Sequence, residues 1–244
     1  MSTRDGRTLL TRRNAVRRRP PGTDHKILLA CGIAASVLYA VDNDLLAALL
    51  YEDYSPLSQA ISELTSPGAP TRTPLMVLGL LYDALVLAFG IGVLRSARGS
   101  RALRTVGALL IAHAAVGPLW LPFPMTARGG SPAHGGLTDT MHIVLGGLTV
   151  VIMLSMIGAG AAAFGRGFRL YSVLTVVAVL AFGAWMSSYA PGVPAGEPTP
   201  WMGLAERLMI WTWLLWMVVL AVLLLRGHPV RPAPGHGDPG GGVG

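Results

Sequence analysis

The sequence predicts an all-α membrane protein, a bundle of six transmembrane helices with both termini in the cytoplasm. Hydrophobic residues make up 52% of the 244 residues and charged residues only 13%, about half the charged fraction of a typical soluble domain. The apolar residues gather in long runs, each near the roughly 20 residues that cross about 30 Å of hydrocarbon as a helix. The cations lie almost entirely in segments on one side of these runs, which is a topology signal.

Each apolar run is expected to be a helix, because backbone polar groups in hydrocarbon must pair within the chain. The runs cover roughly residues 27–48, 74–94, 105–124, 141–164, 170–190 and 204–225. Of the 19 lysines and arginines, all but Arg72, Arg128 and Arg207 fall on the side of the two termini. The positive-inside rule therefore places both termini in the cytoplasm and the three longer linkers outside.

The chain is expected to divide into three parts. Residues 1–26 form a disordered basic cytoplasmic arm, which either sets the topology or binds anionic lipid headgroups. Residues 27–225 form the six-helix membrane domain, whose first helix is an uncleaved signal anchor. Residues 226–244 form a disordered Pro/Gly-rich cytoplasmic tail. The cations are nearly all arginine, with Lys26 the single lysine, which is typical of a GC-rich bacterium.

Composition also limits the partners and the cellular location. The formal net charge of +7 on a soluble protein would suggest nucleic acid, but here the cations flank apolar runs and no recognition motif is present, so nucleic-acid binding is excluded. The lone Cys31 cannot form an internal disulfide. The expected partners are membrane lipids, protein partners are unknown, and the expected location is the cell membrane.

The first outer linker contains a helix signal. Ser55 and Pro56 match an N-cap followed by a proline at the first helical position. Leu57, Ile61 and Leu64 follow at helical spacing and form one apolar stripe, and a Pro-Gly pair comes next. We expect a short amphipathic helix lying on the outer surface, able to act as a lid.

Two polar residues are predicted near the middle of the membrane. Asp83 lies in the second apolar run and His113 in the third, and their depths match on antiparallel helices. A charged group in a bilayer costs roughly 2.5–3.5 kcal/mol, so each is a functional candidate by default. The two side chains are expected to be in contact, directly or through one water, and either to hold and relay a proton or to lock two helices together.

The outer side carries the richest set of candidate residues, and we expect them to converge. They are Ser62, Glu63, Asp139, His142, Glu206 and Arg207. His142, Glu206 and Asp139 are candidate ligands for a divalent metal, the only cofactor the sequence suggests. The catalytic candidates are Ser62, or alternatively Ser58, as a nucleophile, His142 as the base, and Glu206 and Asp139 as supporting acids. Glu63 and Arg207 are candidate ligand-binding residues.

Each outer residue also has a structural interpretation. Asp139 and Glu206 fall at helix N-termini, where acids cap the backbone or interact with the helix dipole. Arg207 has outer acids to pair with. The metal spacings HxxxH and HExxH are absent. A purely structural polar cap therefore remains an alternative to a site.

Several short motifs of the chain resemble those of a known family. They are Tyr54–Ser55, Ile61–Leu64, Phe123–Pro124, His142 and Glu206–Arg207. In this combination the sequence resembles the domain-of-unknown-function 998 family of bacterial and archaeal polytopic membrane proteins, over roughly residues 27–225. The resemblance implies a layout of about six helices and favours the outer residues as one site, but it implies no activity.

Several functions remain open at this point. The expected one is an integral membrane protein whose outer polar site binds a lipid headgroup or small ligand. Alternatives are a membrane-embedded hydrolase using the outer Ser/His/acid cluster and a structural or assembly subunit. A proton-coupled carrier using Asp83 and His113 is disfavoured, because no internal repeat or paired helix interruption is visible.

Overall fold

The computed structural model describes residues 22–130 and 136–230, and the predicted arm up to residue 21 and the tail from residue 231 lie outside this range. Six long helices run through it: α1 (Thr23–Leu50), α2 (Arg72–Ser96), α3 (Arg101–Val116), α4 (Gly136–Ala161), α5 (Arg166–Ser187) and α6 (Met202–Leu225). Short 3₁₀ helices are η1 (Ile61–Thr65), η2 (Gly117–Trp120) and η4 (Ala190–Gly192). The described residues contain no strand.

All six helices are long and apolar enough to cross a membrane, α3 by continuing into η2. The predicted all-α, six-helix fold is therefore confirmed, while the orientation remains a prediction. The helix bounds differ from the predicted ones mainly at polar ends. Thus α1 begins at Thr23 and takes in the last residues of the predicted arm, and α3 begins after Ser100, whose hydroxyl accepts a bond from Leu103 N at 3.4 Å.

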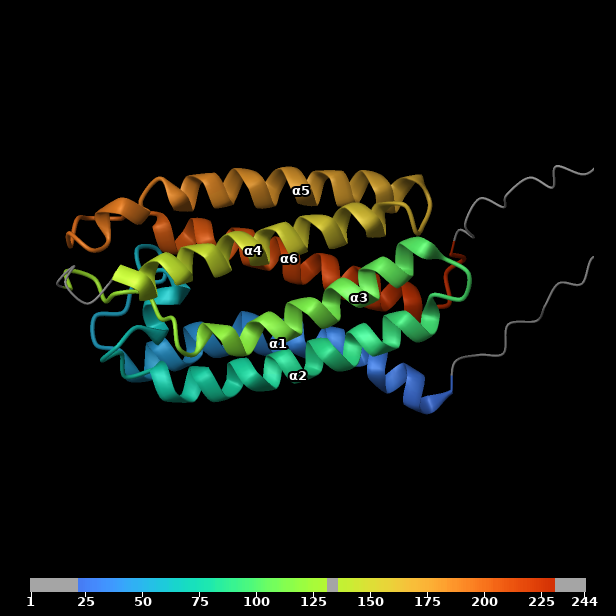
Figure 1. Ribbon diagram of the computed structural model, residues 1–244, viewed down its shortest axis with the longest axis horizontal. Coiled ribbons are helices and arrows are strands. Elements are labelled where there is room, and N and C mark those ends of the chain that lie inside the picture. Colours follow the sequence, from blue (N-terminus) through green and yellow to red (C-terminus); the bar gives the residue numbers. More distant parts are fainter. Residues whose placement is uncertain (1–21, 131–135, 231–244) are drawn as a thin grey trace, which may run out of the picture.

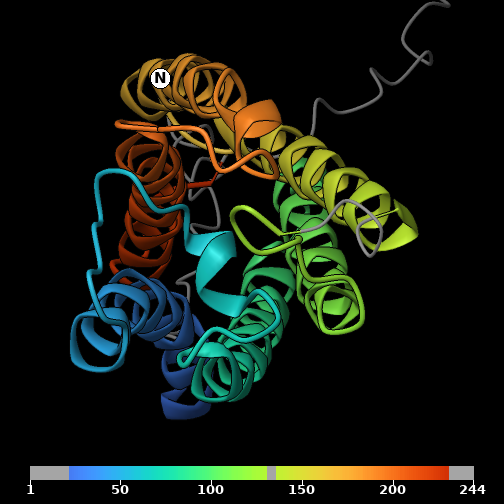
Figure 2. The same cartoon turned by 90° about the vertical axis from the view of Figure 1, so that its left-hand side faces the viewer.

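The helices form a closed ring (Figures 1 and 2). Each one packs against its neighbours in the sequence, and α6 returns to pack against α1. Phe89, Met156 and Trp216 are among the fully buried side chains of the core. Many leucines, valines and isoleucines instead face outward, such as Val77 and Ile143, which are 62% and 73% exposed. An apolar exterior of this kind is what a lipid-facing surface requires.

The two ends of the ring differ. At the short-loop end, residues 97–100 and 162–165 make tight connections, and both α1 begins and α6 ends there (Figure 1). At the long-loop end, which the cation count predicts to face outward, the connections are residues 51–71, 121–135 and 188–201. The candidate residues of the outer side all lie at this second end.

The first long connection enters the ring. Figure 2 shows η1 in the middle of the ring of helices, where Glu63 and Leu64 are 3% and 0% exposed. We call residues 54–66 the plug. The predicted amphipathic surface helix is therefore wrong: the helical part begins only at Ile61, and Leu57, expected to share its buried stripe, is 45% exposed. The physical reason lies in side chains that bind the plug's backbone.

Candidate functional site

Arg207, near the start of α6, holds the plug against α1 and α6. Its Nε and Nη2 reach Oδ1 of Asp44 at 2.8 and 2.7 Å, and Nη1 donates to the carbonyl of Gln59 in the plug at 2.8 Å and to that of Gly203 at 3.0 Å. Nη2 also donates to the Tyr54 hydroxyl at 2.5 Å. The side chain is 2% exposed. Its guanidinium donates four hydrogen bonds in addition to the ion pair with Asp44, as a buried guanidinium requires.

Tyr54 completes this cluster from the plug side. Its hydroxyl accepts the bond from Arg207 and donates one to the Asp44 carboxylate. Burial, together with the bond to Asp44, raises the pKa of Tyr54 well above its usual value. The hydroxyl therefore stays protonated at every physiological pH and remains available as the donor to Asp44.

Arg128, in the second long connection, binds the other side of the plug. Its Nε and Nη2 contact Oε2 and Oε1 of Glu63 at 2.9 and 2.7 Å, a bidentate pair. Nη2 also contacts Thr199 Oγ1 at 2.8 Å, and Nη1 donates to the Glu197 carbonyl at 3.0 Å. Thr199 Oγ1 donates in turn to the Ser58 carbonyl at 3.0 Å. One arginine therefore joins all three long connections.

Two carboxylates accept the backbone amides that open η1. Glu206 of α6, which is buried, accepts from Ile61 N through Oε2 at 2.5 Å, and Glu63 Oε1 accepts from Ala60 N at 2.9 Å. The amides of a buried helix start would otherwise lack partners. The two carboxylates thus supply the acceptors that allow a short 3₁₀ helix to begin inside the ring.

The three cations on the predicted outer side all contact the plug. Arg207 binds the Gln59 carbonyl, Arg128 binds Glu63, and Arg72 at the start of α2 donates through Nη1 to the Thr65 carbonyl at 2.7 Å. This accounts for each of the three exceptions to the charge asymmetry. Arg207 forms its ion pair with Asp44, an acid at the predicted outer end of α1.

Asp139 and His142 fasten a different segment. Asp139 accepts from the backbone N and the hydroxyl of Thr126 at 2.7 and 2.8 Å. His142 Nδ1 lies 3.0 Å from the Phe123 carbonyl, and its ring meets the edge of Trp120 at a centroid distance of 4.8 Å. Both side chains therefore hold the 121–130 connection on α4, and Asp139, three residues inside α4, is not its N-cap.

The structure brings together only some of the residues that were predicted to converge. The plug carries Ser62 and Glu63 and contacts Glu206 and Arg207 of α6. The other two, Asp139 and His142, contact the 121–130 connection instead. No hydrogen bond joins His142 to Glu206 or to Ser62 within the part of the chain described. The described residues also contain no group of three His, Cys, Asp or Glu side chains arranged to hold a metal ion. A metal set of His142, Glu206 and Asp139 is thus not assembled.

The expected direct contact between Asp83 and His113 is also absent. His113 Nε2 lies 3.3 Å from the hydroxyl of Tyr82, and no ion pair joins Asp83 to a described residue. The reason is the rotation of α2: Tyr82 is buried toward the core, while the next residue, Asp83, is only half-buried and lies beside Gly117. Tyr82 therefore occupies the position beside His113 that the equal depth of the two residues predicted for Asp83.

Sequence reasoning missed several residues that build this end. The sequence did not single out Arg128 or Thr199, and it gave Asp44 no partner. In the structure Arg128 contacts Thr199, and Asp44 accepts a hydrogen bond from Arg207. One available signal was the rarity of outer cations. Because the positive-inside rule removes cations from outer loops, each one that remains is a candidate for a specific ion pair.

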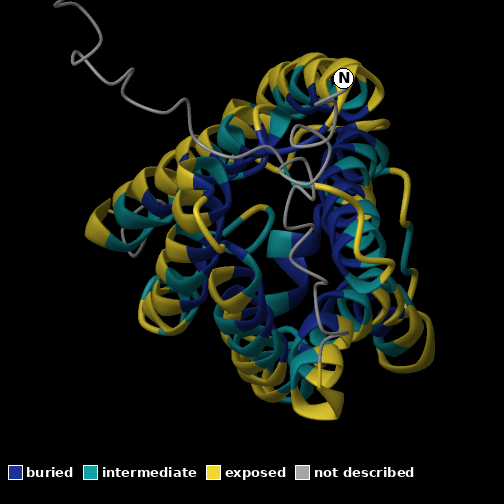
Figure 3. Ribbon diagram, turned by 90° about the vertical axis from the view of Figure 1, so that its right-hand side faces the viewer, coloured by how far each residue is buried: buried dark blue, intermediate teal, exposed yellow. Residues whose placement is uncertain are grey.

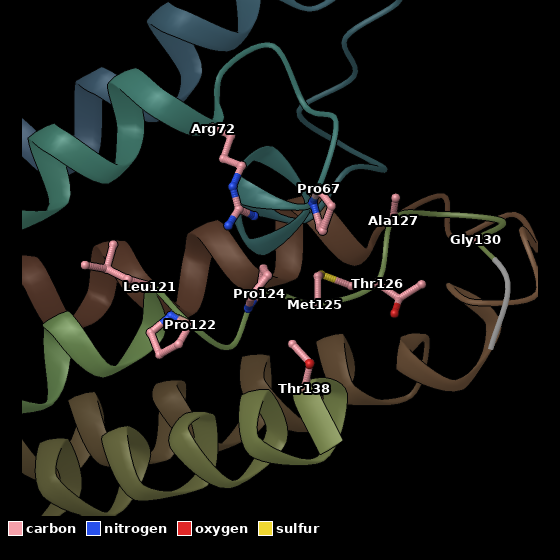
Figure 4. A pocket seen from close by; sticks show the side chains of 10 residues that line it. All are labelled: Pro67, Arg72, Leu121, Pro122, Pro124, Met125, Thr126, Ala127, Gly130 and Thr138. Atoms are coloured by element: carbon pink, nitrogen blue, oxygen red, sulfur yellow. The ribbon is translucent and has the colours of Figure 1, made fainter. Parts of the chain in front are cut away.

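A recess of about 470 Å³ lies beside the plug, and Figure 4 shows the side chains that line it. The lining comes from the residue after the plug, the start of α2, the 121–130 connection and α4: Pro67, Arg72, Leu121, Pro122, Pro124, Met125, Thr126, Ala127, Gly130 and Thr138. The walls are mostly apolar, and the Arg72 guanidinium points into the space. No acid forms an ion pair with Arg72 within the described ranges.

The Glu63–Arg128 pair gives a testable stability prediction. Because the pair is bidentate and Glu63 is only 4% exposed, we expect a coupling free energy of about 1.5–3 kcal/mol, the range for hydrogen bonds to charged groups. A double-mutant cycle of Glu63→Gln and Arg128→Gln, measured by denaturant unfolding in detergent, gives this value. A coupling free energy near zero would mean that solvent screens the pair.

The closed ring of six apolar helices makes the chain a multi-pass membrane protein with a plug at one end. A sequence model of the family described as "Protein of unknown function (DUF998)" matches residues 33–223. The chain therefore belongs to the DUF998 family, which confirms the resemblance drawn from its motifs. No curated protein and no solved structure matches it.

Proposed function

We propose that this protein binds an anionic group, carried by a lipid headgroup or by a small ligand, in the recess of Figure 4 at the outer face of the cell membrane. The observation that supports the proposal is the Arg72 guanidinium. It points into the recess, and only one of its N–H groups has a partner among the described residues, the Thr65 carbonyl. A guanidinium with free N–H groups binds a carboxylate or phosphate in a bidentate manner.

The contrast with the other outer arginines supports this choice of residue. Arg128 and Arg207 bind carboxylates of the protein, so their charges are already neutralised. Arg72 has no such partner in the described residues. Glu63 and Arg207, first expected to bind the ligand, therefore serve the plug in this proposal, and the anion site lies beside it.

The remaining lining suits an amphiphilic ligand. A recess of about 470 Å³ falls in the range of small-molecule sites, which are mostly apolar with a few polar groups that fix orientation. Leu121, Pro122 and Pro124 supply apolar wall, and Thr126 and Thr138 supply hydroxyls. Hydrolysis is not part of the proposal, because no serine–histidine pair forms at this end of the described structure.

The test compares Arg72→Gln with the wild-type protein in nanodiscs. Binding of phosphatidylglycerol, phosphatidylcholine and inorganic phosphate is measured separately, so that a headgroup is distinguished from a free anion. Loss of one charge-assisted interaction is expected to weaken anion binding about tenfold. Phosphate competing with the lipid would identify a small anion as sufficient.

The matched control is Glu52→Gln, a charge removal at an exposed residue of the same long-loop end that does not line the recess. It should leave binding in the recess unchanged. The melting temperature of Arg72→Gln should stay within a few degrees of wild type, because only one hydrogen bond to the plug is lost. Equal anion binding by Arg72→Gln and wild type would contradict the proposed function.

A further inference from the structure

The short-loop end carries a ring of exposed arginines. They come from the end of α2, the α2–α3 connection, the start of α3, the start of α5 and the end of α6: Arg95, Arg98, Arg101, Arg104, Arg166, Arg169 and Arg226. All seven are exposed, and none forms an ion pair with a described residue. These arginines differ from Arg128 and Arg207 at the other end, each of which forms an ion pair with a carboxylate.

The charge at this end is almost unopposed. Among the described residues the single acid there is Asp24, in the first turn of α1, while Lys26 adds a further cation. His25 Nε2 contacts Ser96 Oγ at 2.8 Å, which joins the start of α1 to the end of α2 and brings Lys26 near the arginine-rich α2–α3 connection. The helix ends thus present their cations around one rim.

Several of these cations stand directly beside exposed apolar side chains. Lys26 precedes Ile27, which is 58% exposed, and Arg169 precedes Leu170, which is 62% exposed. Figure 3 looks at this end and shows exposed residues along the outer sides of the helices up to their ends. The cations therefore lie at the level where an apolar, lipid-facing surface stops, which is the level of lipid phosphates.

We propose that this rim is a binding surface for anionic phospholipids, whose phosphates contact the seven arginines and Lys26. The inference is independent of the recess at the other end. A lipid surface fits better than an acidic protein or nucleic acid, because the cations encircle the bundle beside its lipid-facing side chains and are not gathered on one loop. Lipids that surround the bundle can reach all of them.

The test uses the full chain in nanodiscs that contain phosphatidylglycerol and phosphatidylcholine, with native mass spectrometry of the lipids that stay bound. One variant replaces Arg95, Arg98, Arg101 and Arg104 by glutamine, and its matched control replaces the same four by lysine. The wild type should retain phosphatidylglycerol in preference. In the glutamine variant the ratio of retained phosphatidylglycerol to phosphatidylcholine should fall at least fivefold. In the lysine variant most of the preference should remain, since the interaction depends on the positive charge.

A second variant protects the test against a failure to insert. Arg166→Gln with Arg169→Gln removes two cations from the start of α5 and should lower the preference by a smaller factor. Added salt should weaken the preference of the wild type, because exposed charges are screened. Equal retention of phosphatidylglycerol by wild type and glutamine variants, or equal retention of the two lipids by wild type, would overturn the proposal. Lipid binding at Arg72 is unaffected by either result.

Discussion

Replacing Arg207 with alanine is expected to destabilise the protein by about 3 kcal/mol, the lower end of the cost of breaking a buried ion pair, because Arg207 is 2% exposed but Asp44 is 30% exposed. The substitution removes every hydrogen bond that Arg207 makes to Asp44, Tyr54 and the carbonyls of Gln59 and Gly203. Asp44 would then lose its ion-pair partner. The measurement is denaturant unfolding in detergent, followed by tryptophan fluorescence.

Two control variants separate charge from geometry. Arg207→Lys keeps the charge but cannot supply five N–H groups in a planar arrangement, so its stability should lie between those of alanine and wild type. Arg226→Ala removes an exposed arginine just after the other end of α6 and should change stability by less than about 0.5 kcal/mol. If Arg207→Ala lost no more stability than Arg226→Ala, the plug would not depend on this arginine.

Substituting Gly203 with alanine should displace the plug from α6. A Cβ at this position would stand 2.2 Å from the Gln59 carbonyl oxygen and 2.6 Å from that of Pro56. Both are backbone atoms, so neither can move alone. The nearby bond from Leu204 N to the Leu57 carbonyl, at 3.0 Å, should break with them. Overpacking in a tight core costs about 1–3 kcal/mol and more where backbone must shift.

The matched control for this variant is Gly158→Ala. Gly158 lies within α4, and a Cβ there meets nothing within 4 Å. Alanine also favours the helix more than glycine does, so this variant should be as stable as wild type or slightly more stable. Limited proteolysis of the 51–71 connection gives a second readout, since a displaced plug should be cleaved faster in Gly203→Ala alone.

The sequence is sufficient to predict the helices because their signal is local. A run of about 20 apolar residues predicts a spanning helix wherever its neighbours lie, and all six predicted runs correspond to helices of the structure. The same local reasoning gave the wrong structure for the plug. Leu57, Ile61 and Leu64 have helical spacing, but the backbone there is bound by Glu206, Arg207 and Arg128 from elsewhere in the chain, and these bonds override the local pattern.

Partner choice in the candidate site depends on rotations that depth alone does not determine. Asp83 and His113 have equal depth, yet the rotation of α2 about its axis places Tyr82, the residue before Asp83, beside His113. Asp139 falls in the first turn of α4 and Glu206 just after the first turn of α6, yet each carboxylate reaches across to another segment of the chain, Thr126 or Ile61. Charge and position pointed to Glu63, Glu206 and Arg207 but not to Arg128 or Thr199, and the pairing of all these residues needed the three-dimensional arrangement.

The bonds that hold the plug also constrain the order in which the chain assembles. Glu206 and Ile61 lie 145 positions apart in the sequence, and Arg207 and Asp44 lie 163 apart. Contacts of such separation close late, after the entropy of bringing distant segments together has been overcome. During synthesis α1 and η1 therefore precede their partner α6 by four intervening helices, α2, α3, α4 and α5. Because α6 supplies both Glu206 and Arg207, the bonds of these two residues to η1 and α1 can form only after the last helix has been made, and the ring cannot close before then.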